Sequence, residues 1–158
     1  MSEEPRIDPG GVILGVLAVA TVIAAESTRQ ESYPRLVLAS LISVAVYWVS
    51  HAYARHWAWR LHHSFDWTAA ELWGSMQFES TLLIGALLPV VVLALGWAAG
   101  WSRETTVTAV LWCAGIELIV LEVLTAVKRR LPTRDLVVQV AMGVVMATGI
   151  LLLRLVLH

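Results

Sequence analysis

Five apolar segments of about 20 residues each follow one another along this chain, and no other feature of the sequence constrains the fold as strongly. An α-helix of that length crosses the hydrocarbon core of a bilayer. One such segment could be a buried helix of a soluble protein, but five in succession indicate membrane spans. Composition agrees, because only 15% of the residues are charged, whereas a soluble domain has about a quarter. The sequence therefore predicts an all-α, polytopic membrane helical bundle, with residues 1–158 forming a single integral membrane domain.

The five transmembrane helices are expected at approximately residues 10–25, 34–54, 78–101, 105–127 and 134–157. The stretch between the second and third spans differs, because tryptophans there alternate with histidines and charged residues, as is typical of the headgroup region. Thr68 and Glu71 in this stretch fit a capping box. We therefore predict an interfacial amphipathic helix at about residues 66–77, and we expect Trp57 and Trp59 before it to lie at the lipid interface.

Basic residues beside the spans predict the orientation of the chain. If the N-terminus lies inside, the inner segments hold seven Lys and Arg residues and the outer segments hold four. Cytoplasmic segments carry the excess of these residues, so we expect a multi-pass protein of the plasma membrane with a cytoplasmic N-terminus and an external C-terminus. Most of the bias comes from residues 128–134, where Arg129 and Arg130 are expected at the lipid interface beside anionic headgroups. The net charge of −1 gives no basic surface for nucleic acid.

The second span carries a single polar stripe. Five side chains recur at intervals of three and four residues and therefore share one helix face: Ser40, Ser43, Tyr47, His51 and Arg55. Lipid cannot satisfy polar groups, so we expect this face to meet other helices or water. It is either a hydrogen-bonding seam between helices or the wall of a functional cavity.

Most polar residues of the other spans are expected in the same half of the membrane, close to the inner end, with Glu26 at the outer end of the first span as the exception. Glu117 is deeper, at roughly 16 Å from the inner end of its span, which places it near the midplane. Glu79 is expected in the first turn of the third span, where a carboxylate favours the positive helix end. The candidate site comprises Glu117, His51, Tyr47, Glu79, Glu122 and Gln139. Glu79 and Glu122 are the expected partners of His51.

Residues 47–54, YWVSHAYA, form an aromatic-Trp-x-x-His-x-Tyr-Ala element. In this element the chain resembles a group of small, uncharacterised actinobacterial integral membrane proteins. The likeness continues through a tryptophan-bearing surface helix to a glutamate that begins a proline-containing span, here Trp73, Glu79, Pro89 and Gly96. It covers most of the chain, but outside the His-x-Tyr-Ala element it is mainly apolar. The resemblance implies the fold and the topology and carries no known activity.

Transport is the first of three functions that these residues allow. The protein would be a channel or carrier for protons or a small cation. Glu117 would be neutral when dry and charged when wetted, and a carboxyl of that kind can relay a proton. A histidine titrates near neutral pH, so His51 could act as an inner relay or a pH sensor, with Tyr47 orienting it from one helical turn away.

A structural or accessory role without transport activity is the second possibility. Three pairs of small residues four positions apart allow helices to approach closely: Gly11 with Gly15, Gly96 with Gly100, and Gly143 with Ala147. A chain of 158 residues encloses little interior alone, so a homo-oligomer surrounded by the lipid bilayer is expected. Glu117 would then be a protonated hydrogen-bond donor to a neighbouring helix.

A membrane-embedded metalloenzyme is the third and least expected function. In it, His51 and the carboxylates of the candidate site would ligate a metal or act as acid and base. No H-E-x-x-H or G-x-S-x-G motif supports this, and no pattern identifies a metal or a cofactor. The histidines outside the second span (His56, His62 and His63) are expected to be solvated at the interface rather than bound to metal.

Overall fold

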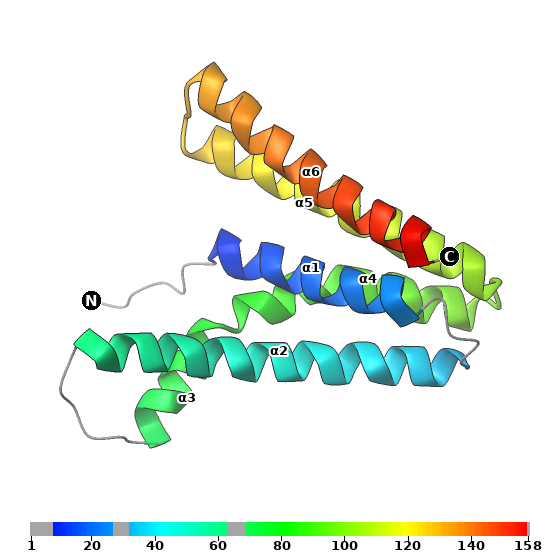
Figure 1. Cartoon of the computed structure of the whole chain (residues 1–158), viewed down its shortest axis with the longest axis horizontal. Helices are drawn as coiled ribbons and strands as arrows, with labels where there is room; N and C mark the ends of the chain where they lie inside the picture. The colour runs from blue at the N-terminus through cyan, green and yellow to red at the C-terminus, as the bar shows by residue number, and fades with distance from the viewer. Residues whose placement is uncertain (1–7, 27–31, 63–68, 158) are drawn as a thin grey trace.

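Six α-helices account for almost all of the described chain (Figure 1). The computed structural model describes residues 8–26, 32–62 and 69–157. The helices are α1 (Pro9–Glu26), α2 (Tyr33–His62), α3 (Ala69–Phe78), α4 (Thr81–Ala98), α5 (Arg103–Lys128) and α6 (Thr133–Leu157). All except α3 are long and apolar enough to cross a membrane. The predicted all-α bundle with five spanning helices is therefore confirmed, and there is no strand among the residues described.

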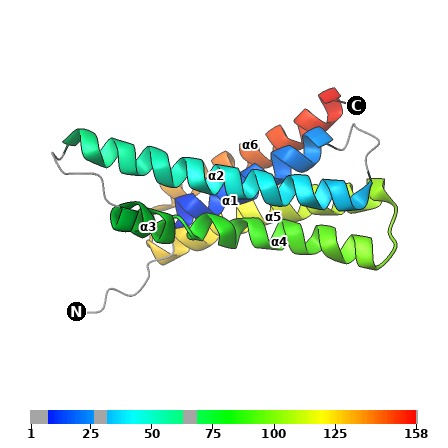
Figure 2. The same ribbon diagram turned by 90° about the horizontal axis from the view of Figure 1, so that it is seen from below.

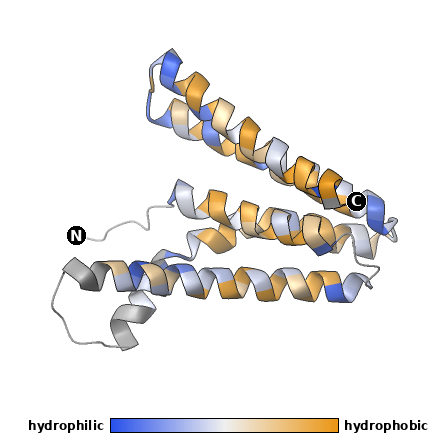
Figure 3. Ribbon diagram, viewed as in Figure 1, coloured by the Kyte–Doolittle hydropathy of each residue, from blue (hydrophilic) through white to orange (hydrophobic). Residues whose placement is uncertain are grey.

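Successive spans run in opposite directions, so the two termini lie at opposite ends of the bundle (Figures 1 and 2). We call one end the Glu79 end, which holds α3, the start of α1 and the turn between α5 and α6. The other is the Trp101 end, which holds the turn between α4 and α5 and the end of α6. Hydrophilic residues gather at the turns and hydrophobic residues cover most of the helix bodies (Figure 3).

Side chains cap two of the helix starts. Asp8 precedes Pro9, and its Oδ1 accepts a hydrogen bond from the Gly10 amide at 3.2 Å. Ser102 has an extended backbone before α5, and its hydroxyl accepts a hydrogen bond from the Thr105 amide at 3.2 Å. Each cap satisfies an amide that has no partner within its own helix. Proline suits the first position of α1 because its missing N–H would have had no partner there.

The C-terminus of α4 closes in a Schellman motif. The amide of Trp101 donates to the carbonyl of Gly96 at 3.0 Å, and the amide of Gly100 donates to that of Trp97 at 3.1 Å. This arrangement requires a left-handed backbone at the residue after the helix cap, and glycine is the usual choice because it has no Cβ. Gly100 meets the requirement, with φ of 69°.

The C-terminus of α5 closes in the same motif, but without a glycine. The amide of Leu131 donates to the carbonyl of Ala126 at 3.1 Å, and the amide of Arg130 donates to that of Val127 at 3.0 Å. Arg130 occupies the left-handed position, with φ of 51°. A residue with a Cβ pays roughly 1 kcal/mol in this conformation. Within the described chain it is the one non-glycine residue with positive φ.

Glycines let α1 and α4 pack with their backbones in contact. A Cβ added to Gly15 would overlap the carbonyl oxygen of Leu82, and one added to Gly85 would overlap the carbonyl oxygen of Val12. Each helix therefore receives the backbone of the other in a glycine notch. Gly11 lies along the same contact, so the first predicted pair of small residues packs inside the chain and not against a second copy.

The other two pairs of small residues differ in use. Gly143 and Ala147 of α6 both face α5, and the Cβ of Ala147 lies 3.3 Å from the position of a Cβ on Gly115. Gly96 and Gly100 do not form a helix contact together. Gly100 lies beyond the end of α4, where its backbone conformation makes the turn. The second predicted pair is therefore wrong as a packing motif.

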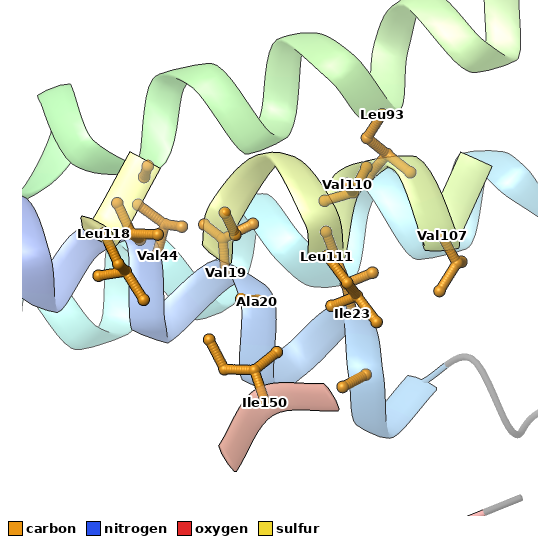
Figure 4. Packing of buried hydrophobic residues seen from close by; sticks show 14 of the residues in the cluster. Val19, Ala20, Ile23, Val44, Leu93, Val107, Val110, Leu111, Leu118 and Ile150 are labelled. Atoms are coloured by element: carbon orange, nitrogen blue, oxygen red, sulfur yellow. The ribbon is translucent and has the colours of Figure 1, made fainter. Parts of the chain in front are cut away.

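The buried core follows α1 through the centre of the bundle (Figure 4). Val19, Ala20 and Ile23 of α1 are fully buried. Side chains from every other span surround them: Val44, Leu93, Leu111, Leu118 and Ile150. Of the five spans, α1 is the most enclosed and α6 the least. Most apolar side chains of α6 are exposed, as expected for a helix at the lipid boundary.

Two spans have limits that differ clearly from those expected. Helix α2 continues past residue 54 to His62, because residues 55–62 contain neither a glycine nor a proline to end it. The third span begins at Thr81 and ends at Ala98, since a turn precedes it and the Gly100 motif closes it. Thr68 of the expected capping box lies outside the described residues, which resume with α3 at Ala69.

Candidate functional site

Glu79 carries a buried carboxylate at one end of the bundle. Its side chain is only 1% exposed. It lies with Ser80 in the turn between α3 and α4, where the Leu82 amide donates to the Glu79 carbonyl at 3.1 Å. Glu79 therefore precedes α4. The prediction that it lies in the first turn of the third span is wrong. The carboxylate remains near the positive N-terminal end of α4 and faces α2.

Two side chains of α2 contact the two oxygens of this carboxylate. Arg55 Nη1 donates to Glu79 Oε1 at 2.8 Å, which is the length of a charge-assisted hydrogen bond. His51 Nε2 lies 3.5 Å from Glu79 Oε2, a longer contact that becomes an ion pair when the imidazole is protonated. The expected contact between His51 and Glu79 is thus present, and Arg55 makes the shorter one.

The three ionisable side chains differ sharply in exposure. The side chains of His51 and Arg55 are 39% and 49% exposed, while that of Glu79 is enclosed. Long cationic side chains commonly bury their stems and leave their charged ends in water. The arrangement places a buried negative charge directly behind two groups that reach the surface. Bulk water therefore screens their interaction with this carboxylate less than it screens a fully exposed pair.

The buried face of α2 lies beside the predicted polar stripe. Buried residues are spaced by multiples of four along the helix: Leu36, Ser40, Val44, Ala52 and His56. From Ser43 onward the polar stripe also advances by four residues at each step, so it stays one residue, or about 100°, from the buried row. At the Glu79 end, His51 and Arg55 therefore lie beside the buried row and reach Glu79 from its flank.

The polar stripe does not pack against other helices along its whole length. Ser40 is its one fully buried member, and its hydroxyl donates to the Leu36 carbonyl of the same helix at 2.8 Å. Tyr47 is exposed, and its ring stacks on the imidazole of His51 with the ring centroids 6.3 Å apart and the planes at 6°. The neighbouring Trp48 donates from Nε1 to the Met76 carbonyl at 3.1 Å, which ties α3 to α2.

Glu122 and Gln139 lie on the hairpin formed by α5 and α6, apart from His51. Glu122 is buried where α5 meets α6, with its Cγ 3.2 Å from the position of a Cβ on Gly143. Gln139 is half-buried on α6. Helix α2 packs instead on α1, α3 and α4. The predicted partnership of Glu122 with His51 is therefore wrong, because a shared depth in the membrane does not imply a shared side of the bundle.

Glu117 lies near the middle of α5 and is half-buried. Its Oε2 is enclosed and has no hydrogen-bond partner among the described residues. Most buried polar atoms in folded proteins do have such a partner, so this oxygen is an exception that requires an explanation. Glu117 and Glu122 lie on different sides of α5, in agreement with their spacing of five residues.

Contacts at the Trp101 end were not predicted from the sequence. The hydroxyl of Tyr33 donates to the carbonyl of Trp101 at 2.7 Å and lies 2.8 Å from the hydroxyl of Thr106. Arg103 Nη2 donates to the Glu26 carbonyl at 2.7 Å. These bonds join the ends of α1, α2, α4 and α5. A tyrosine and an arginine flanking spans were the available signals, but nothing in the sequence pairs them across the bundle.

His56 and the tryptophans near it have different environments. His56 is only 4% exposed, and its Nε2 has no partner among the described residues, so the expectation that it is solvated is wrong. It follows Ala52 by four residues and so continues the buried row. Trp57 is 51% exposed, whereas the side chain of Trp59 lies outside the described set, as do those of His62 and His63.

Ligand geometry for a metal is not found in the described part of the chain. No three His, Cys, Asp or Glu side chains of residues 8–26, 32–62 and 69–157 gather closely enough to hold an ion. Glu79 and His51 are two potential ligands, but the guanidinium of Arg55 occupies one carboxylate oxygen.

In comparisons with known proteins, no family model, curated protein or solved structure matches this chain.

Proposed function

We propose that this multi-pass membrane protein conducts or carries protons or a small cation across the plasma membrane, with Glu117 as its group in the middle of the membrane. The observation that carries the proposal is the enclosed Oε2 of Glu117, which has no hydrogen-bond partner among the described residues. An unsatisfied buried polar group costs about 1–3 kcal/mol. A carboxyl that must exchange a proton or bind a passing ion has a reason to lack a permanent hydrogen-bond partner, whereas a purely structural carboxyl does not.

The surroundings of Glu117 favour this function over a role in joining copies. A carboxyl that holds two subunits together would present its oxygens to the partner. Here the unsatisfied oxygen is enclosed within the chain, so a second copy cannot reach it while the helices keep this arrangement. The small residues that could have served an oligomer are also in use within the chain, at the contact between α1 and α4 and at that between α5 and α6.

The cluster of Glu79, His51 and Arg55 is the proposed control point at one end of the path. The half-exposed imidazole of His51 can take up a proton from solvent, and its Nε2 lies 3.5 Å from the buried carboxylate. A protonated His51 would bind the Glu79 carboxylate more strongly and compete with Arg55 for it. The position of α3 would follow, because Trp48 fastens this helix to α2 a short distance away.

The Glu79 end is proposed to be cytoplasmic. Among the described residues, that end holds six basic residues: Arg55, Arg60, Lys128, Arg129, Arg130 and Arg134. The Trp101 end holds Arg35, Arg103 and Arg154. The excess supports a cytoplasmic Glu79 end and N-terminus and an external C-terminus.

Flux into liposomes tests the proposal. Purified protein is reconstituted into vesicles that contain a trapped pH-sensitive dye, and an inward proton gradient or a potassium diffusion potential is applied. We expect proton entry faster than in protein-free vesicles and most of it lost in Glu117→Gln, which keeps the shape of the side chain but cannot ionise. The same vesicles with dyes for sodium and potassium cover the cation form of the proposal.

Glu104→Gln is the matched control. Glu104 is exposed in the first turn of the same helix, so the substitution removes an equal charge away from the midplane. Its flux should equal that of the unmodified protein. Undiminished flux in Glu117→Gln would remove Glu117 from the path. Vesicles that are no more permeable than empty ones to protons, sodium and potassium would leave the structural or accessory role in its place.

A further inference from the structure

The turn between α5 and α6 concentrates positive charge on the surface of the Glu79 end. Within the eight positions 128–135 there are four basic residues, Lys128, Arg129, Arg130 and Arg134, and one acidic residue, Asp135. All five are exposed. None of the four basic side chains forms an ion pair with a described acidic residue. Figure 3 shows this turn as a hydrophilic segment that joins two largely hydrophobic helices.

Arg130 occupies a backbone position that normally belongs to glycine. The turns after α4 and α5 contain the same pair of closing hydrogen bonds, so the chain itself provides a comparison. Gly100 takes the left-handed position in one turn with φ of 69°, and Arg130 takes it in the other with φ of 51°. Because a non-glycine residue is strained there, folding alone favours glycine. The arginine at this position therefore points to a role for its charge that offsets the strain.

Apolar side chains continue directly from the basic turn on both helices. Val127 of α5 is 62% exposed, and Val137 and Val138 of α6 are each 58% exposed. The surface therefore has a cationic cap, formed by the basic turn, next to two apolar walls, formed by the exposed valines of α5 and α6. This combination matches a molecule with an anionic head and apolar chains, whereas a free phosphate ion would match the cap alone.

We propose that the turn at residues 128–134 binds the headgroup of an anionic phospholipid, whose acyl chains lie along the exposed valines of α5 and α6. The arginines recognise the phosphate, because guanidinium groups bind phosphate oxygens through paired hydrogen bonds. The location fits, since a short turn between two spanning helices lies at the level of the headgroups. The turn projects at the Glu79 end, on the side of the bundle away from α2 and α3 (Figure 1).

Native mass spectrometry of the detergent-purified protein tests this site. Phosphatidylglycerol and phosphatidylcholine are titrated separately, and the dissociation constant of the first bound lipid is measured for each. The unmodified protein should bind phosphatidylglycerol more tightly than phosphatidylcholine. Arg130→Gly and Arg129→Gln should each weaken phosphatidylglycerol binding by about fivefold, the effect of one basic residue near an anionic surface. Binding of phosphatidylcholine should not change in either variant.

Three controls decide between specific and general effects. Arg35→Gln removes one exposed charge at the Trp101 end and should leave the affinity unchanged. Inorganic phosphate in large excess should not displace the lipid, because it cannot occupy the apolar walls. All affinities are measured in detergent solution, where the basic residues cannot act by changing the orientation of the protein in a membrane. Equal affinity for the two lipids, or an equal loss in Arg35→Gln, would overturn the proposal, as would displacement of the lipid by phosphate.

Discussion

Arg55 Nη1 donates a hydrogen bond of 2.8 Å to Oε1 of Glu79, 24 residues further along the chain, and the bond joins α2 to the turn that precedes α4. The donor is half exposed and the acceptor is enclosed. The pair therefore compensates a charge that water cannot reach. Its removal should affect the stability of the Glu79 end more than that of the rest of the bundle.

Arg55→Ala should lower the free energy of unfolding by about 2 kcal/mol. A fully buried pair loses about 3–5 kcal/mol when one partner is removed, and a surface pair less than 1 kcal/mol, so a pair with one exposed member lies between. Glu79→Gln should cost a similar amount, and the double variant should cost less than the sum of the two. The measurement is the midpoint of unfolding by a denaturing detergent. Strict additivity would show that the two side chains do not interact.

Trp48→Phe should loosen α3 without unfolding the spans. The substitution keeps an aromatic ring but removes the bond from Nε1 to the Met76 carbonyl, which contributes about 1 kcal/mol. Amide hydrogen exchange in Ala69–Phe78 should therefore become about fivefold faster, while exchange in α4 stays unchanged. Trp97→Phe is the control, because Trp97 is an exposed residue of α4. Equal protection of α3 in both variants would contradict this docking.

Gly15→Ala should destabilise the bundle by about 1–3 kcal/mol. The new methyl group would overlap the Leu82 carbonyl, and backbone cannot move aside as a flexible side chain does. Gly149→Ala provides the comparison, since a Cβ on this exposed glycine of α6 meets nothing within 4 Å. That variant should be neutral or up to about 1 kcal/mol more stable, because alanine favours helix. Thermal unfolding in detergent distinguishes the two, and similar shifts would show that α1 and α4 do not pack as described.

Substitutions at the two Schellman motifs should have opposite signs. Gly100→Ala places a Cβ in a left-handed backbone and should cost about 1 kcal/mol. Arg130→Gly removes a Cβ from the same conformation and should gain a similar amount, less the added chain entropy of glycine in the unfolded state. Both are measured as shifts of the unfolding midpoint. A loss of stability in Arg130→Gly would show that the arginine is held by contacts within the chain.

The spanning helices could be predicted because hydropathy along the chain is a local property. Residues such as Val16, Val19 and Ile23 place α1 in the membrane whatever surrounds it. Helix limits were less predictable where the signal was weak. The continuation of α2 past residue 54 depends on helix formers within a polar segment, and the end of α4 depends on Gly100, which also fits a glycine packing motif.

The lateral arrangement of the helices could not be predicted, because the depth of a residue in the membrane does not give its position around the bundle. His51 and Glu79 were expected to meet and do meet, whereas Glu122, which was expected at a similar depth, faces α6. The role of Arg55 was hidden for a different reason. Its place on the helix predicts a direction for the side chain, but a long flexible side chain can reach a partner beside that direction.

The glycine contact between α1 and α4 has a consequence for the order in which this protein is made. Gly15 lies in the first span, and the Leu82 carbonyl that fills its notch belongs to the third. During synthesis, α1 must therefore enter the bilayer and stay there through its own hydrophobicity while α2 and α3 are still being added. A chain halted before α4 would hold an open backbone seam toward lipid, and this seam is the surface by which a membrane chaperone or protease could distinguish an unfinished molecule from a finished one.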